Sequence, residues 1–151
     1  MENDATHIFP LVLAIKTFGP MVLEVGCGWY STPIVHAMSH QSITIENDPE
    51  WHGRLQRIAP DRILCVPNVV SAANKLATER KFNVVFIDCY NGEDRVSVAK
   101  LFLDFKCCIV AHDTERSYWN SILSIAKFHK RFDLFVPNTS WISNVLDFTL
   151  A

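Results

Sequence analysis

The chain has 151 residues, of which 49% are hydrophobic and 20% charged, and its formal net charge is −2. A chain of this length can bury a substantial core as one domain, which we expect to span residues 1–151. The near-neutral charge argues against nucleic acid or a membrane surface as partner, because binding either of these normally requires an excess of basic residues.

Cysteine usage and the N-terminal residues bear on where the protein resides. The five cysteines are an odd number, and none has the spacing of zinc ligands. The acidic start, residues 1–4, is unlike a signal peptide, and the apolar stretch 8–15 is too short to span a bilayer. We therefore expect a soluble, cytoplasmic protein with reduced thiols.

The first elements are a helix and then a strand that runs into a glycine turn. A helix is predicted over residues 6–18, where it covers the sheet edge or helps to close the site. The apolar run 22–25 predicts a strand, and Gly26 and Gly28 predict a tight turn after it. The next helix is predicted over 32–39, with Ser31 or Thr32 as its cap. A helix that begins on such a turn points its free N–H groups at a ligand.

The second predicted strand, residues 42–46, ends in an acid. Glu46 lies 20 residues after Gly26. In open α/β sheets an acid at this spacing accepts hydrogen bonds from a ribose hydroxyl pair. Asp48 then caps a helix that continues to Ile58, and a strand over 62–66 and a helix over 70–78 follow.

The second half of the chain continues the alternation and then breaks it. A strand over 82–88 ends in Asp88, a helix covers 93–104, and a strand over 107–111 leads into His112 and Asp113. A helix is predicted over 116–129, with the basic cluster 127–131 as favourable charge at its C-terminus. Two strands, 132–136 and 141–148, then follow without a helix between them, which predicts a hairpin and an antiparallel last strand.

This order predicts a doubly wound, mostly parallel, seven-stranded Rossmann-like sheet between two helix layers, with an antiparallel C-terminal hairpin. Ligands of such sheets bind outside the carboxyl ends of the strands, near the point where strand order reverses. Glu46, Asp88 and Asp113 each follow a predicted strand. We therefore expect these three acids to line one site.

From Val22 to about Phe148 the layout resembles the class I S-adenosylmethionine-dependent methyltransferases. The resemblance is carried by VLEVGCG (22–28), Glu46 after ITI, VVFIDCY (84–90), CCIVAHD (107–113) and the hairpin. The hairpin, and Ser31 in place of the third glycine of GxGxxG, separate the chain from nicotinamide-binding domains. The implied cofactor is S-adenosylmethionine.

The resemblance assigns cofactor contacts to the first turn. Glu24, Gly26 and Gly28 would form the turn under the methionine part of the cofactor. Ser31 and Thr32 match a variant of this loop and would bind the methionine carboxylate.

Further cofactor contacts are implied at the ends of later strands. Glu46 would hold the ribose, with Asn47 beside it. Asn68 would contact the adenine edge, where the family often has an acid. Asp88 would face the methionine amino group or the substrate.

Methyl transfer from a sulfonium is an in-line displacement, so positioning supplies much of the acceleration. An acceptor that carries a proton also needs a general base. The catalytic candidates are Asp88, His112 and Asp113, although His112 could equally end its strand with a structural hydrogen bond. The side chains available to grip a substrate are Tyr90, Arg95, Arg116, Tyr118 and Trp119.

Two subfamilies share further marks with the chain. Asp88 and Asp113 match the metal-binding acids of catechol-type O-methyltransferases, but Thr114 and Asn91 replace that subfamily's asparagine and lysine. A divalent metal is therefore left open but not favoured. A looser likeness to glucuronoxylan methyltransferases is carried by residues 46–51, by the His112–Asp113 pair with Arg116, and by Trp141.

We therefore expect a methyltransferase that acts on an oxygen or nitrogen of a small molecule or sugar. The alternatives are a catalytically silent cofactor-binding subunit of a larger assembly, and an enzyme that cleaves the cofactor in another way. A nicotinamide-dependent oxidoreductase has less support, since no Tyr-x-x-x-Lys pair is present. A homo-oligomer, or a partner chain that completes the site, stays open.

Overall fold

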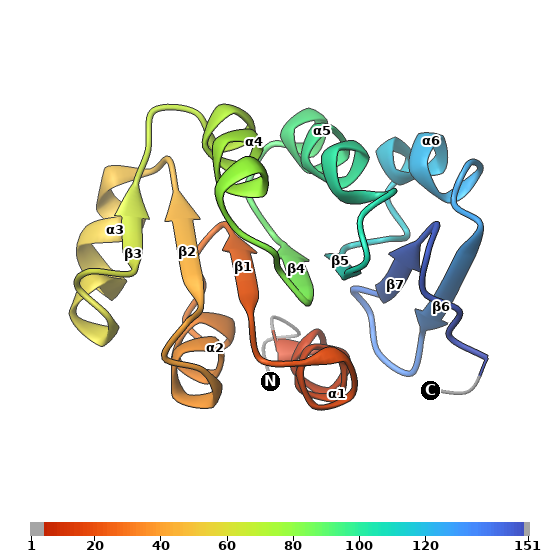
Figure 1. The fold of residues 1–151 in the computed structure, drawn as a ribbon, viewed down its shortest axis with the longest axis horizontal. Helices are drawn as coiled ribbons and strands as arrows, with labels where there is room; N and C mark the ends of the chain where they lie inside the picture. Colours follow the sequence, from red (N-terminus) through yellow and green to blue (C-terminus); the bar gives the residue numbers. More distant parts are fainter. Residues whose placement is uncertain (1–4, 150–151) are drawn as a thin grey trace.

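The computed structural model describes residues 5–149, which form a seven-stranded sheet with helices on both faces (Figure 1). The strands are β1 (Val22–Val25), β2 (Ile43–Glu46), β3 (Ile63–Cys65), β4 (Val84–Ile87), β5 (Cys108–His112), β6 (Phe128–Phe132) and β7 (Thr139–Ser143). The helices are α1 (Ile8–Phe18), α2 (Ser31–Met38), α3 (Pro49–Leu55), α4 (Val69–Glu79), α5 (Gly92–Phe102) and α6 (Asn120–Leu123), with 3₁₀ turns η2 (Gln56–Ile58) and η3 (Ser117–Trp119). The acidic start considered above, residues 1–4, lies outside the described residues.

The strand order is β3-β2-β1-β4-β5-β7-β6, which confirms the predicted doubly wound sheet. The first five strands pair in parallel, whereas β7 is antiparallel to both β5 and β6. The predicted hairpin is therefore present. The order reverses between β1 and β4, so a ligand site is expected above these two strands.

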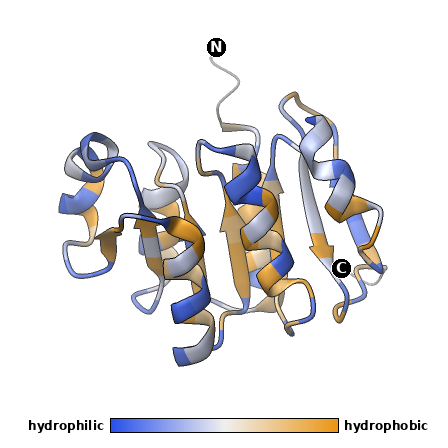
Figure 2. Cartoon of the chain, turned by 90° about the horizontal axis from the view of Figure 1, so that it is seen from above, coloured by the Kyte–Doolittle hydropathy of each residue, from blue (hydrophilic) through white to orange (hydrophobic). Residues whose placement is uncertain are grey.

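The centre of the sheet consists of short strands that are buried along their whole length. Every residue of β1, β2, β4 and β5 is buried, as expected for parallel strands covered on both faces. Leu23 lies opposite Ile43 on one side and Val85 on the other, and Val85 lies opposite Ile109. In Figure 2 the strands at the centre of the sheet are largely hydrophobic, and the helices in front of them carry both hydrophilic and hydrophobic residues.

Each face of the sheet has its own apolar core. Helices α4, α5 and α6 cover one face, where Phe102 and Trp119 are buried. Helices α1 and α2 cover the other face, and Leu11 of α1 packs there with Phe86 and Trp141. The N-terminal helix therefore lies across the sheet face rather than at its edge.

Side-chain caps fix the start of several helices next to the site. Asp48 Oδ1 accepts from the backbone N–H of Glu50 and Trp51, which begins α3 as predicted. Asn91 caps α5 in the same way. The cap predicted for α2 is wrong, because α2 begins at Ser31 itself and has no side-chain cap.

The predicted helix over 116–129 is also wrong. The chain makes only the short turn η3 and α6, which ends at Leu123, and residues 128–132 form β6. The basic cluster 127–131 therefore runs into a strand and does not end a helix. Phe128, Lys130 and Phe132 are half-buried while His129 and Arg131 are exposed, the alternation of a strand with one covered face. The hairpin strands accordingly lie at 128–132 and 139–143, several residues before their predicted positions.

Among residues 5–149, no helix combines the length and the apolar character needed to cross a bilayer.

Candidate functional site

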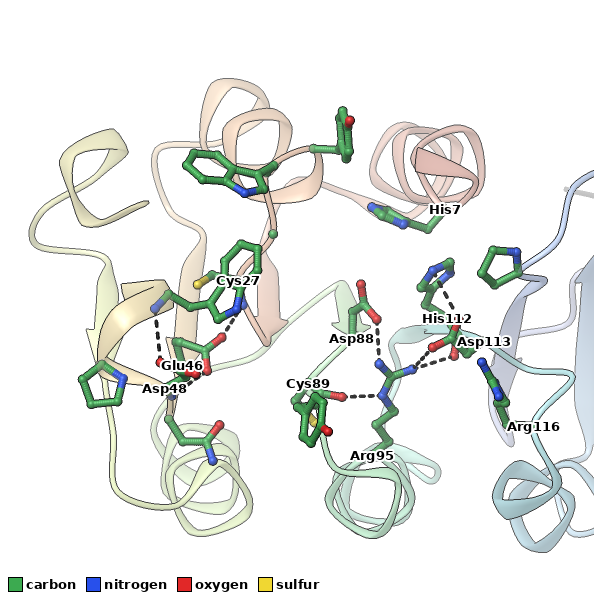
Figure 3. A pocket seen from close by; sticks show the side chains of 18 residues that line it. His7, Cys27, Glu46, Asp48, Asp88, Cys89, Arg95, His112, Asp113 and Arg116 are labelled. Atoms are coloured by element: carbon green, nitrogen blue, oxygen red, sulfur yellow. Dashed lines mark hydrogen bonds and ion pairs between the residues drawn. The ribbon is translucent and has the colours of Figure 1, made fainter. Parts of the chain in front are cut away.

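A cavity of about 880 Å³ opens at the carboxyl ends of β1, β2, β4 and β5. Its wall includes Glu46 from the end of β2, Asp88 after β4, and His112 and Asp113 at the end of β5 (Figure 3). The volume falls within the range of small-molecule and cofactor sites. The cavity lies where the strand order reverses, and the three acids line it together, as expected from their places at the strand ends.

The turn after β1 passes against the loop that follows β4. Gly26 has φ = 91°, and a Cβ added to it would lie 2.5 Å from the backbone nitrogen of Cys89. Only glycine meets both conditions without strain. The Thr32 hydroxyl then accepts from the Gly28 N–H at 2.9 Å and closes the turn against the start of α2.

Backbone N–H groups hold the Glu46 carboxylate in place. Its Oε2 accepts from the Cys27 N–H and its Oε1 from the Asp48 N–H, both at 2.8 Å. Glu46 is 6% exposed and lines the cavity. The carboxylate therefore links the glycine turn to the start of α3 and presents a fixed acceptor pair to the cavity.

Arg95 of α5 bridges the other two acids. Its Nη2 lies 2.8 Å from Asp88 Oδ1, its Nη1 lies 2.8 Å from Asp113 Oδ2, and its Nε donates to the carbonyl of Cys89. Asp113 has a left-handed backbone with φ = 57°, which turns the chain after β5. Burial raises the pKa of Asp88 to about 7, and the guanidinium of Arg95 only partly offsets this.

Two buried histidines complete the floor of the cavity. His112 Nδ1 lies 3.2 Å from the Thr139 hydroxyl, and its backbone carbonyl accepts from Trp119 Nε1 at 3.0 Å. His7, just before α1, places its ring 4.7 Å from that of His112, centroid to centroid. Burial lowers the pKa of His7 to about 3, so its imidazole is neutral. Sequence reasoning missed His7, because no local motif signals where α1 docks.

The structure brings many of the predicted site residues to the cavity. The predicted residues that line it are Gly28, Glu46, Asn47, Asp88, Tyr90, Arg95, His112, Asp113 and Arg116. Tyr90 is fully exposed and Arg116 largely so, and both lie at the rim. Arg95, expected to grip a substrate, is instead occupied by the two acids.

The predicted loop contacts lie behind the cavity wall. Glu24 is fully buried in β1 and accepts from the Thr44 hydroxyl at 2.6 Å. Burial raises its pKa to about 7. Ser31, Thr32 and Gly26 are also buried. Glu24, Gly26, Ser31 and Thr32 are not among the residues that line the cavity, and their cofactor contacts stay a prediction.

Three further predicted contacts lie elsewhere. Asn68 is exposed and caps α4 by accepting from the Ser71 N–H. Tyr118 is half-buried with its hydroxyl 3.3 Å from Arg95 Nη1. Trp119 is fully buried, so the expectation that it touches a substrate is corrected: it anchors the β5 end through His112. Cys89 does line the cavity, but it is buried, and burial raises the pKa of its thiol to about 12.

No protein-family model matches the sequence, and no curated protein does. Solved structures do match its fold. A methyltransferase from Geobacter sulfurreducens is 18% identical with a TM-score of 0.65, and the match covers 94% of this chain and 80% of the other. The C-terminal domain of precorrin-6Y C5,15-methyltransferase from Rhodobacter capsulatus is 16% identical with a TM-score of 0.59, over 89% and 87% of the two chains.

A third match is a point mutant of MtNAS in complex with S-adenosylmethionine. It is 11% identical with a TM-score of 0.56, over 91% of this chain and 60% of that one. At such identities the likeness concerns the fold. The strand order, the antiparallel β7 and these matches agree: the chain has the fold of the class I S-adenosylmethionine-dependent methyltransferases.

Proposed function

We propose that this protein is an S-adenosylmethionine-dependent methyltransferase that acts on an oxygen or nitrogen of a small molecule or sugar. The observation that carries the proposal is the position of Glu46. Its carboxylate is fixed at the end of β2 by two backbone N–H groups and faces the cavity. A carboxylate in this place is suited to accept hydrogen bonds from both hydroxyls of a ribose.

The rest of the cavity fits such a cofactor. The Gly26 turn keeps the end of β1 close to the Asp88–Cys89 backbone, next to the opening of the cavity. Trp29 and Trp51, with ring centroids 6.0 Å apart, supply an apolar wall on the Glu46 side. Asp88 supplies a negative group on the opposite side, suited to the positive amino group of the methionine part.

The bound cofactor would supply a methyl group on a sulfonium, and the protein has to position the acceptor and manage its proton. Asp88, with its pKa raised to about 7 by burial, can hold or release a proton near neutral pH. Arg95 links Asp88 to Asp113, and the His112 Nε2 lies 3.5 Å from Asp113 Oδ1, so these side chains would form the rest of the proton-handling group. At the rim, Arg116 is the charged side chain available for a carboxylate or phosphate on the acceptor.

Calorimetric titration with S-adenosylmethionine, S-adenosylhomocysteine and NADH tests the cofactor. We expect micromolar binding of the first two, lost or greatly weakened in Glu46→Ala. The matched control is Glu50→Ala, because Glu50 is an exposed acid on neighbouring α3 that does not line the cavity. Binding of NADH alone, or equal weakening by both variants, would overturn the proposal.

The reaction is tested with a methyl-labelled cofactor and a panel of hydroxyl, amine and carboxylated sugar acceptors. Transfer of label to an acceptor, with S-adenosylhomocysteine as the second product, is the expected result. Tight cofactor binding with no transfer to any acceptor would argue for a silent cofactor-binding subunit, and a different product would indicate cleavage of another bond.

A further inference from the structure

Three potential metal ligands meet at one place in the cavity. His7, Asp88 and His112 come from the start of α1, the end of β4 and the end of β5, and their ligand atoms all lie within 4.8 Å of one another. Figure 3 shows these side chains converging on one part of the cavity. They are far apart in the sequence, so the fold alone assembles them.

The buried imidazole of His7 is a second observation that points to a bound ion. It is 3% exposed and lines the cavity, yet neither ring nitrogen has a hydrogen-bond partner. Buried polar groups are almost always paired, because leaving one unpaired costs stability. An apolar residue of similar shape would pack against Phe86 and His112 at less cost. The unpaired nitrogens therefore point to a ligand.

The neighbours of the other two side chains resemble the outer shell of a metal site. Ligating carboxylates and imidazoles are usually oriented by second hydrogen bonds. Asp88 Oδ1 accepts from Arg95, and the Thr139 hydroxyl lies 3.2 Å from His112 Nδ1. His112 Nε2 also lies 3.5 Å from Asp113 Oδ1, so an ion would bind one ring nitrogen while the other keeps its neighbour.

We propose that His7, Asp88 and His112 bind a divalent transition-metal ion of the zinc, cobalt(II) and iron(II) group. Two imidazoles and one carboxylate suit these ions, whereas magnesium and calcium prefer oxygen ligands alone. Three protein ligands leave a coordination position open to the cavity. Ligand atoms around such an ion lie roughly 3.4 Å apart, given bonds of about 2.1 Å, so small side-chain rotations close the site.

This site differs from the acid pair that the sequence suggested. Arg95 contacts both acids, but only Asp88 belongs to the three-ligand group. An ion held by His7 instead lies at the cavity floor beside Asp88. There it would bind an acceptor oxygen and lower the pKa of its hydroxyl. This catalytic role rests on the proposed function, whereas the binding of the ion does not.

The test uses tag-free protein and Co²⁺, whose visible absorption reports coordination number, with calorimetry for stoichiometry. We expect one Co²⁺ per chain, displaced by Zn²⁺ but not by excess Mg²⁺. His7→Phe keeps an aromatic ring against Phe86 and removes the ligand. It should weaken Co²⁺ binding by about 100-fold or more, beyond the loss expected from an outer-shell change. Its Tm without metal should equal or exceed that of the wild type.

The control variant is His129→Ala, because His129 is exposed on β6 and lies outside the cavity. It should leave Co²⁺ binding unchanged. Co²⁺ binding that survives in His7→Phe, that is lost in His129→Ala, or that Mg²⁺ displaces equally well would overturn the metal site. A second variant, Asp88→Asn, should also reduce binding, and unchanged affinity there would count against the site as well.

Failure of the metal site and failure of the proposed function give different results. S-adenosylhomocysteine binding is titrated with and without Co²⁺. Cofactor binding without any Co²⁺ site overturns the metal proposal alone. A Co²⁺ site lost in His7→Phe, in a protein that binds neither cofactor form, overturns the methyltransferase proposal alone.

Discussion

Arg95 Nη2 lies 2.8 Å from Asp88 Oδ1, and this ion pair connects α5 to the end of β4 inside the candidate site. The arginine side chain is 7% exposed and the aspartate 23%. Because the same guanidinium also reaches Asp113, one cation holds together two acids from neighbouring strands. Its removal would leave both carboxylates without their main partner.

We predict that Arg95→Met destabilises the protein by about 3–5 kcal/mol at pH 8, since breaking a buried pair leaves uncompensated charge. The loss should be smaller at pH 5, where the carboxyl group of Asp88, with its pKa near 7, is protonated. Urea unfolding at both pH values measures the effect. Arg116→Met, at an exposed position, should change stability by only about 0.5 kcal/mol. Equal effects of the two variants would contradict the bridging role.

Glu24 should make the protein less stable as the pH rises. Burial raises its pKa from 4.5 to about 7 in the folded state. The folded state therefore binds more protons than the unfolded state between these values, and its stability falls as pH rises through that window. Glu24→Gln keeps an acceptor for Thr44, so it should gain on the order of 1–3 kcal/mol over the wild type at pH 8 and little at pH 4.5.

Unfolding curves of the wild type and Glu24→Gln across pH 4–8 provide the measurement. The stability of Glu24→Gln should still fall as the pH rises, though less steeply, because the pKa of Asp88 is also raised. Glu79→Gln, at the exposed end of α4, is the control. If Glu24→Gln is no more stable than the wild type at pH 8, the carboxyl group is not held in the environment described.

Two glycines should respond in opposite ways to alanine. Gly26→Ala forces a Cβ to within 2.5 Å of the Cys89 nitrogen at φ = 91°, so we expect a loss of about 2 kcal/mol or more. Gly53 is exposed within α3 and has nothing within 4 Å of an added Cβ. Gly53→Ala should gain about 0.5–1 kcal/mol. Thermal unfolding of both variants measures the effects. If Gly26→Ala left the stability unchanged, the turn geometry described above would be wrong.

Tryptophan fluorescence should report cofactor binding. Trp29 and Trp51 line the cavity, whereas Trp119 and Trp141 are fully buried in the core. S-adenosylhomocysteine should therefore change the emission of the first pair. In a Trp29→Phe/Trp51→Phe variant most of this change should disappear while emission from the core pair persists. An undiminished response would place the ligand outside this cavity.

The sequence predicted those parts of the fold and site that follow from buried apolar runs and from the order of helices and strands along the chain. The central strands are apolar runs that end in acids, and parallel strands align their carboxyl ends, so the convergence of Glu46, Asp88 and Asp113 could be predicted. The hairpin followed from the missing helix between its two strands. Each strand with its terminal acid can be recognised from residues that are close in sequence, and the parallel sheet then brings the acids together.

Tertiary contacts decided the features that the sequence did not reveal. Residues 128–132 form a strand because β7 offers a partner and Lys130 packs over the ring of Trp141, neither of which is visible locally. His7 reaches His112 only because Leu11 and its neighbours dock α1 on the sheet. Trp119 looked like a rim residue but lies in the core, because η3 turns its ring inward to His112.

The basic residues of β6 have a consequence for how copies of this chain behave at high concentration. β6 and β3 are the two edge strands of the sheet, and the unpaired backbone groups of an edge strand are a template for pairing with another molecule. β3 offers only three residues, and β6 presents His129, Lys130 and Arg131 in succession. A second copy adding along β6 would bring like charges together. Aggregation by strand addition is therefore disfavoured at both edges of the sheet.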